Sequence, residues 1–345
     1  MVAPWTAVCL QTATVSLANA RTRDEIRATV AAGVRRIDGL IERHKASGPG
    51  DLFLLPEKVL GDREDDLRGC LRFSGPEIAG LQQVAAKHRV YIGANCYTLN
   101  EEFPGRYFNT SFVIDRSGAV ILKSYRLHTY HSTSPHDFWQ RFIDKVGIDG
   151  AFPVAKTELG NLAILPSMEL MFPEIARIFV LRGAEVLMHT TMDKIVDQSV
   201  KRARATENMA FVMSANVTGN VGSDEFMKPD SIIVNWRGQV LAQCPAGDEN
   251  SCSATIEIDP LRQRRVIPDF TYPPYGVNYL SRLRTEIAAT GYAAAALYPV
   301  DTYKDGDVVT AAISPATANK EKLKQSLRNM ARAGMVPAEL LRDDL

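Results

Sequence analysis

The sequence predicts an α/β protein whose sheets are covered by helices. Short apolar segments that are typical of strands alternate with longer segments in which apolar residues recur every three or four positions. Some consecutive strands are separated only by turn residues, which indicates hairpins within the same pattern. The length of 345 residues suits one large α/β domain with an extension, or two ordinary domains.

The first half of the chain begins with a strand at 5–11 and a long helix at 26–42. Five aliphatic residues recur on one face of this helix: Ile26, Val30, Val34, Ile37 and Ile41. The apolar run LFLLP at 52–56 has the pattern of a strand buried on both faces. The other elements expected here are a helix at 76–87 and strands at 91–97, 111–115 and 119–122.

The second half repeats the alternation and then changes in composition. Strands are expected at 162–165, 185–189, 211–216, 231–235 and 239–244, with helices at 173–182 and 196–209. We therefore divide the chain into a domain at 1–265 and an extension at 266–345. The extension begins with an irregular, Pro- and Tyr-rich arm at 268–275. Helices are expected in it at 280–289 and 320–333, and Leu323, Leu327 and Met330 share one face of the second. We expect this tail to pack on the body or on a second subunit.

Composition excludes several classes of function. Forty basic residues balance forty acidic ones, so nucleic acid is not expected as a main partner. We find neither an apolar stretch of about 18 residues nor a signal peptide, so we expect no membrane association and a cytoplasmic protein. The five cysteines are scattered; Cys244 and Cys252 could pair, but a reduced chain is favoured.

Three segments carry candidate chemistry on local grounds. Glu57 follows the buried run LFLLP, at the strand end where α/β proteins bind ligands, although a solvated glutamate is the common alternative. Ser167 follows the strand LAIL in a strand–turn–helix arrangement similar to a nucleophile elbow, without its G-x-S-x-G motif. The third segment is KSYRLH at 123–128, after a turn at Gly118.

Together these segments resemble the nitrilase, or carbon–nitrogen hydrolase, superfamily over about residues 5–260. The order and spacing of the landmarks carry the resemblance, since no single one is specific. They are LFLLPE, YFNTS with VIDRSG, GAVILKSYRLH, GNLAILPSMELMFPE, RGAEV, and RATEN with the later AN.

The resemblance implies an α-β-β-α sandwich that dimerises, with a Glu-Lys-Cys triad and neither a metal nor an organic cofactor. Glu57 matches the general base of the family, while Arg126 stands at the lysine position and Ser167 at the cysteine position. Met168 follows at the position whose backbone N–H helps to stabilise the oxyanion. Asp137 is the nearest candidate for a further family glutamate between the lysine and the nucleophile.

The two replacements change the chemistry. A serine hydroxyl ionises far less readily than a thiol, whose pKa is about 8.5, and it normally needs an imidazole partner. Arg126 retains a positive charge for an oxyanion but cannot give up a proton. His189, at the end of the strand EVLMH, or His128 could act as a base toward Ser167; the alternative is that each is an ordinary hydrogen-bonded histidine.

A metal site is not expected, although His128, His131 and His136 form a short run. The run lies in a Ser/Thr/Pro-rich segment without a further close set of Cys, Asp or Glu ligands.

Two functions remain open from the sequence, and both have a small molecule as the ligand. The first is a hydrolase that acts on the C–N bond of a small amide-type substrate, with Ser167 as nucleophile and Glu57 or a histidine as base. The second is a pseudoenzyme that keeps the pocket and the dimer; a pocket filled by Met168 or Tyr125 would favour it. A serine introduced by mutagenesis would not explain Arg126.

We also expect a homodimer or a higher homo-oligomer with the helix at 173–182 in the interface. Ile175, Ile178, Phe179 and Leu181 give this helix more than one apolar face, and large exposed apolar patches are rare on monomers.

Overall fold

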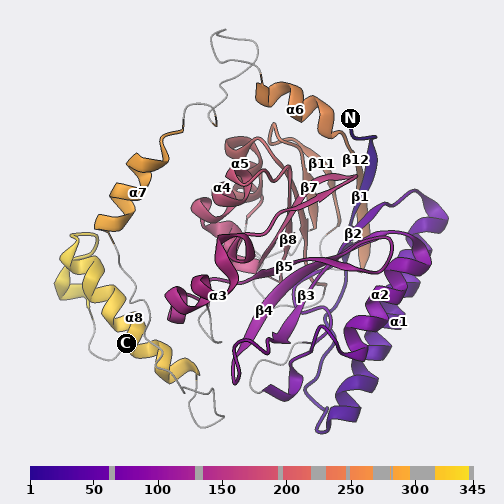
Figure 1. Cartoon of the computed structure of the whole chain (residues 1–345), viewed down its shortest axis with the longest axis horizontal. Helices are drawn as coiled ribbons and strands as arrows, with labels where there is room; N and C mark the ends of the chain where they lie inside the picture. Colours follow the sequence, from indigo (N-terminus) through magenta and orange to yellow (C-terminus); the bar gives the residue numbers. More distant parts are fainter. Residues whose placement is uncertain are drawn as a thin grey trace.

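Two six-stranded sheets form the centre of the computed structural model (Figure 1). The structure describes residues 1–61, 67–128, 135–192, 197–218, 231–245, 249–266, 280, 283–295 and 315–341. The first sheet has the order β12-β1-β2-β3-β4-β5, and the second has the order β11-β10-β9-β8-β7-β6. The predicted α/β class is confirmed.

The first sheet is mixed, with a parallel centre. Strand β1 pairs in parallel with β2, and β2 with β3, while β4, β5 and β12 add antiparallel neighbours. The strands are β1 (Trp5–Gln11), β2 (Leu52–Leu54), β3 (Tyr91–Leu99), β4 (Tyr107–Ile114), β5 (Val120–Tyr125) and β12 (Asn250–Ile256).

Helices α1 (Arg23–Ser47) and α2 (Pro76–His88) cover the outer face of this sheet. A capping box starts α1, because Thr22 accepts from the backbone N–H of Glu25 and the Glu25 carboxylate accepts from that of Thr22. Pro76 starts α2 at its first turn, where proline leaves no hydrogen bond unmade.

The second sheet holds a parallel trio that carries the segment around Ser167. Strand β8 pairs in parallel with both β7 and β9. The strands are β6 (Ala155–Thr157), β7 (Gly160–Pro166), β8 (Val186–Thr190), β9 (Phe211–Ala215), β10 (Ile232–Val234) and β11 (Val240–Gln243). This half of the chain also contains four helices: α3 (Trp139–Ala151), α4 (Pro173–Leu181), α5 (Gln198–Asn208) and α6 (Ile258–Val266).

Three apolar clusters explain the layers. One lies between the first sheet and helices α1 and α2, a second between the two sheets, and a third between the second sheet and helices α4 and α5. Neighbouring residues of one strand belong to different clusters, as the period of two requires; in β2, Leu54 faces the other sheet and Phe53 faces the helices. The order of layers is therefore helix, sheet, sheet, helix, and the expected α-β-β-α sandwich is confirmed.

Several elements differ from the sequence prediction. Strand β4 begins at Tyr107 rather than at 111, because the polar residues that hid its beginning are buried and hydrogen-bonded. Helix α7 is Thr285–Ala294 rather than 280–289, which follows its alanine-rich sequence. The prediction did not include β6, β12, α3 or α6. The arm expected at 268–275 lies outside the described residues.

The apolar residues of α4 divide between two faces of the helix. Phe179 is 2% exposed and packs in the cluster between α4 and its own sheet, so this side chain cannot also serve a partner. The outward residues are Ile178 and Leu181, and Leu181 is 47% exposed. They line a groove of about 380 Å³ between α4 and α7.

The C-terminal helix α8 (Pro315–Arg332) stands apart from the sandwich in Figure 1. Leu323 is 46% exposed, and no described residue of α8 belongs to any of the three clusters. No helix among the described residues has the length and apolar character that a bilayer span needs. All five cysteines are buried and unbridged.

Candidate active site

Glu57 lies just beyond β2, at the edge of the first sheet where its parallel strands end. The residue is 1% exposed. Its Oε1 atom accepts from Asn109 Nδ2 at 2.6 Å and contacts Arg126 Nη1 at 3.4 Å. Its Oε2 atom is buried and has no hydrogen-bond partner among the described residues. A buried carboxylate oxygen without a partner is costly, so this atom is the natural place for a proton or a ligand donor.

A buried amide network fixes the orientation of Glu57. Asn95 Nδ2 donates to Asn109 Oδ1 at 2.6 Å and to Ser111 Oγ at 2.9 Å, so Asn109 must direct its NH₂ group at Glu57. The backbone N–H of Lys58 donates to Asn95 Oδ1 at 2.9 Å. The sequence analysis missed these partners as site residues, although polar side chains inside fully buried strands were a visible signal.

Arg126 follows β5 and bridges Glu57 to its own loop. Its Nε donates to the backbone oxygen of His128 at 2.8 Å, while its Nη1 faces Glu57. Its Nη2 has no partner among the residues that the structure describes, and the side chain is 15% exposed. The guanidinium therefore offers donors beside the unsatisfied oxygen of Glu57.

Ser167 occupies a strained turn directly after β7. Its φ angle of +49° lies in the left-handed region, which non-glycine residues rarely adopt. A short 3₁₀ helix (Ser167–Met171) and then α4 follow it. Such strain persists only where the surroundings enforce it, and it concentrates at functional sites.

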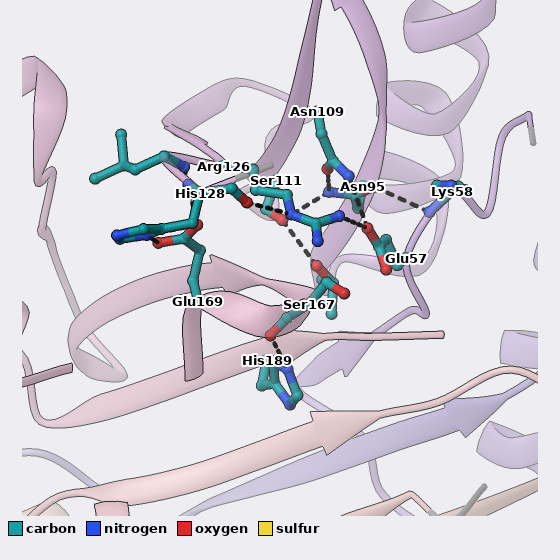
Figure 2. Close-up of polar contacts among 12 residues, drawn as sticks. Glu57, Lys58, Asn95, Asn109, Ser111, Arg126, His128, Ser167, Glu169 and His189 are labelled. Carbon is teal, nitrogen blue, oxygen red and sulfur yellow. Dashed lines mark hydrogen bonds and ion pairs between the residues drawn. The ribbon is translucent and has the colours of Figure 1, made fainter. Parts of the chain in front are cut away.

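The turns that carry Glu57 and Ser167 adjoin the same end of β8, and Arg126 contacts Glu57 there. Pro166 pairs with Thr190 in the parallel register of β7 and β8, and the N–H of Glu57 donates to the oxygen of Thr191 at 3.3 Å. The turn at Ser167 and the turn at Glu57 therefore meet across the end of β8. Figure 2 shows the Arg126 guanidinium pointing toward Glu57, with Ser167 beside them.

His189 contacts the backbone of Ser167 rather than offering a free nitrogen. Its Nε2 lies 2.7 Å from the carbonyl oxygen of Ser167, and its Nδ1 lies 2.9 Å from Ser214 Oγ. Burial, reinforced by the positive charge of Lys201, lowers the pKa of His189 to about 3. The ring is therefore neutral at physiological pH with both nitrogens engaged, and its contacts do not support the base role considered for it.

His128 is held at the rim of the site by Glu169, a residue to which the sequence analysis gave no role. Glu169 Oε1 accepts from the N–H groups of Leu127 and His128 at 3.0 and 2.6 Å, and His128 Nδ1 lies 3.0 Å from Glu169 Oε2. The imidazole stacks on Phe172 at 3.9 Å. In Figure 2 this ring points away from Ser167, so its base role is not supported either.

The structure describes the remaining candidates only in part. Asp137 belongs to the short helix Pro135–Phe138, but its side chain lies outside the described part of the chain. Met168, next to Ser167, is half-buried. His131 and the side chain of His136 also lie outside the described part, and the described residues contain no cluster of three or more His, Cys, Asp or Glu side chains that could hold a metal ion.

Comparisons with known proteins give the family and the fold of the chain. The carbon–nitrogen hydrolase family model matches residues 14–266. The chain is similar to a formamidase of Pseudomonas syringae pv. tomato, with 25% identity over 272 residues that cover 75% of this chain and 74% of that protein.

Two solved structures share the fold. Nit3 of Saccharomyces cerevisiae has a TM-score of 0.60 at 19% identity, covering 78% of this chain and 96% of that chain. A cysteine-to-alanine variant of the Nesterenkonia AN1 amidase has a TM-score of 0.60 at 18% identity, covering 83% of this chain and 97% of that chain.

Proposed function

Because the chain belongs to the carbon–nitrogen hydrolase family, we propose that its Glu57–Arg126–Ser167 cluster hydrolyses the C–N bond of a small amide. The observation that carries the proposal is the buried, unpartnered Oε2 of Glu57, which lies in one cluster with a cation and a strained serine. An unsatisfied buried carboxylate oxygen and a left-handed serine both cost folding free energy. A site without activity would not need to retain both.

The proposed reaction begins with Ser167 Oγ attacking the carbonyl carbon of the amide. The hydroxyl proton passes to Glu57 Oε2 while the carbon–oxygen bond forms. Arg126 and the backbone N–H of Met168 stabilise the oxyanion. The C–N bond then breaks, the amine leaves with the proton held by Glu57, and water hydrolyses the acyl ester on Ser167.

A relative supports the covalent route. In a variant of the Nesterenkonia amidase, the acetamide moiety of fluoroacetamide is attached to the active-site cysteine. Ser167 stands at the cysteine position here and would carry the acyl group as an ester. Because a hydroxyl is harder to ionise than a thiol, we expect slow turnover.

The test measures ammonia release from a panel of short amides with wild type, Ser167→Ala and Glu57→Gln, and with Glu158→Gln as a surface control. We expect both site variants to lower the rate by about 10²–10⁴-fold, the usual contribution of a nucleophile or base, and the control to leave it unchanged. Activity that survives Ser167→Ala would contradict the proposal.

A second candidate is binding without turnover. The 3.4 Å contact of Arg126 with Glu57 favours this function. A guanidinium does not lose its proton at neutral pH, so it can hydrogen-bond a carbonyl ligand without transferring a proton to it. Binding of a short amide by calorimetry, with no ammonia released by wild type over hours, would identify this function.

A further inference from the structure

The inference concerns how the turn at Ser167 is held, and it rests on the proposed function only in taking Ser167 as the reacting group. The left-handed backbone of Ser167 must be enforced by its neighbours, since a serine does not adopt it by preference. The carbonyl oxygen of this same residue lies 2.7 Å from His189 Nε2. Figure 2 shows this contact directly below the turn.

The tautomer of His189 follows from its two partners. The carbonyl oxygen of Ser167 can only accept, so Nε2 must carry the ring proton. The other nitrogen, Nδ1, then accepts from the Ser214 hydroxyl at 2.9 Å. Both His189 and Ser214 are 0% exposed, so water cannot replace either bond.

The placement of the pair also separates it from the chemistry. His189 and Ser214 face each other between the parallel strands β8 and β9, in register with one another. His189 contacts Ser167 at its backbone carbonyl oxygen. We propose that His189, oriented by Ser214, is a positioning residue that holds Ser167 in the left-handed turn and so directs its side chain at Glu57 and Arg126.

The experiment reads the geometry of the turn without requiring amide hydrolysis. Ser167→Cys introduces a sixth thiol, and iodoacetamide labelling located on the peptide that contains position 167 separates it from the five native cysteines, which are also buried. The rate of labelling is measured against pH in this background, alone and with His189→Leu, His189→Gln or Ser214→Ala. Thr98→Val, which removes a different buried hydroxyl pair at 2.7 Å, is the matched control.

We expect His189→Leu to lower the labelling rate at pH 7.5 about tenfold, since it removes the hydrogen bond that the imidazole donates to the carbonyl of residue 167. The amide nitrogen of His189→Gln should restore the rate to within about twofold, because it donates from a similar position. Ser214→Ala should give an intermediate loss of about threefold, and it serves if His189→Leu does not fold. Thr98→Val should lower thermal stability without changing the rate.

Two outcomes would overturn the inference. One is equal labelling in every folded variant, which would make His189 a stabilising residue only. The other is a Ser167→Cys protein that resists iodoacetamide, because the turn would then not present its side chain to a ligand. The pH dependence of labelling is also compared with and without Glu57→Gln. If the two profiles are equal, Glu57 is not the base, which would count against the proposed function without affecting the role of His189.

Discussion

At the scale of single residues, the site is defined by the one carboxylate oxygen of Glu57 that has no hydrogen-bond partner among the described residues. Asn109 and Arg126 both occupy Oε1 of Glu57, so its other oxygen alone is left to exchange a proton. The sequence predicted the three central residues by motif order. The buried polar residues were visible in the sequence, but their contacts were not, because Asn95 and Asn109 lie on different strands and meet only through the register of those strands.

The same scale explains why the histidine hypothesis was not supported. The sequence placed His189 at a strand end near Ser167, which the structure bears out. Which atom of Ser167 the imidazole would contact depends on the backbone angle of the turn, and no residue pattern reveals that angle.

We predict that exchanging the two replaced residues raises amide turnover. Ser167→Cys together with Arg126→Lys should increase the rate by at least about tenfold, because a thiol ionises more readily and an ammonium can exchange a proton. Ammonia release by the single and double variants measures this. A fall in the rate with Ser167→Cys alone would show that the site is adapted to the serine.

His189 also makes the stability depend on pH. Burial lowers the pKa of His189 from its ordinary value of 6.5 to about 3, so the folded state favours the neutral ring. Its contribution is complete above about pH 6.5 and is lost as the pH falls toward 3. Between pH 7.5 and pH 5 the free energy of unfolding should fall about 2 kcal/mol further in wild type than in His189→Gln, as measured by urea unfolding. Equal pH dependence in the two proteins would contradict the lowered pKa.

At the scale of elements, α4 has two different faces. Phe179 and Ile175 bury one face on the second sheet, while Ile178 and Leu181 point into the groove shared with α7. The side chain of Tyr292 in α7 also contacts Glu174 at the start of α4. The sequence identified the excess of apolar residues but not which of them face outward, since both faces are apolar.

We predict that the outward face of α4 forms a homodimer contact. Leu181→Glu should convert the protein to a monomer in sedimentation velocity at micromolar concentration, because a charge would be buried without a partner. Leu241→Glu is a matched control, since Leu241 is 40% exposed on β11 and Leu181 is 47% exposed. A wild-type monomer would contradict the prediction, and so would a dimer that survives Leu181→Glu.

At the scale of the whole molecule, the site depends on both sheets meeting at one end. Glu57 and Arg126 come from the first sheet and Ser167 from the second, and Ser111 Oγ contacts Thr190 Oγ1 across the layers at 2.8 Å. The strand and helix pattern predicted the class of the fold, and the landmarks predicted the four layers. Short elements such as β6 carry too few residues for a pattern, and β12 alternates mostly polar residues along an exposed edge.

The central claim is that Ser167 forms a covalent acyl intermediate in this protein. The most direct measurement is intact-protein and peptide mass spectrometry after rapid acid quenching of a reaction with a short amide or its activated ester. We predict an acyl adduct on the peptide that contains Ser167, and we predict that Ser167→Ala lacks it. An adduct formed in Glu57→Gln should last longer than the wild-type adduct. A substrate-dependent product without any adduct at Ser167, or an adduct on another residue, would contradict the account.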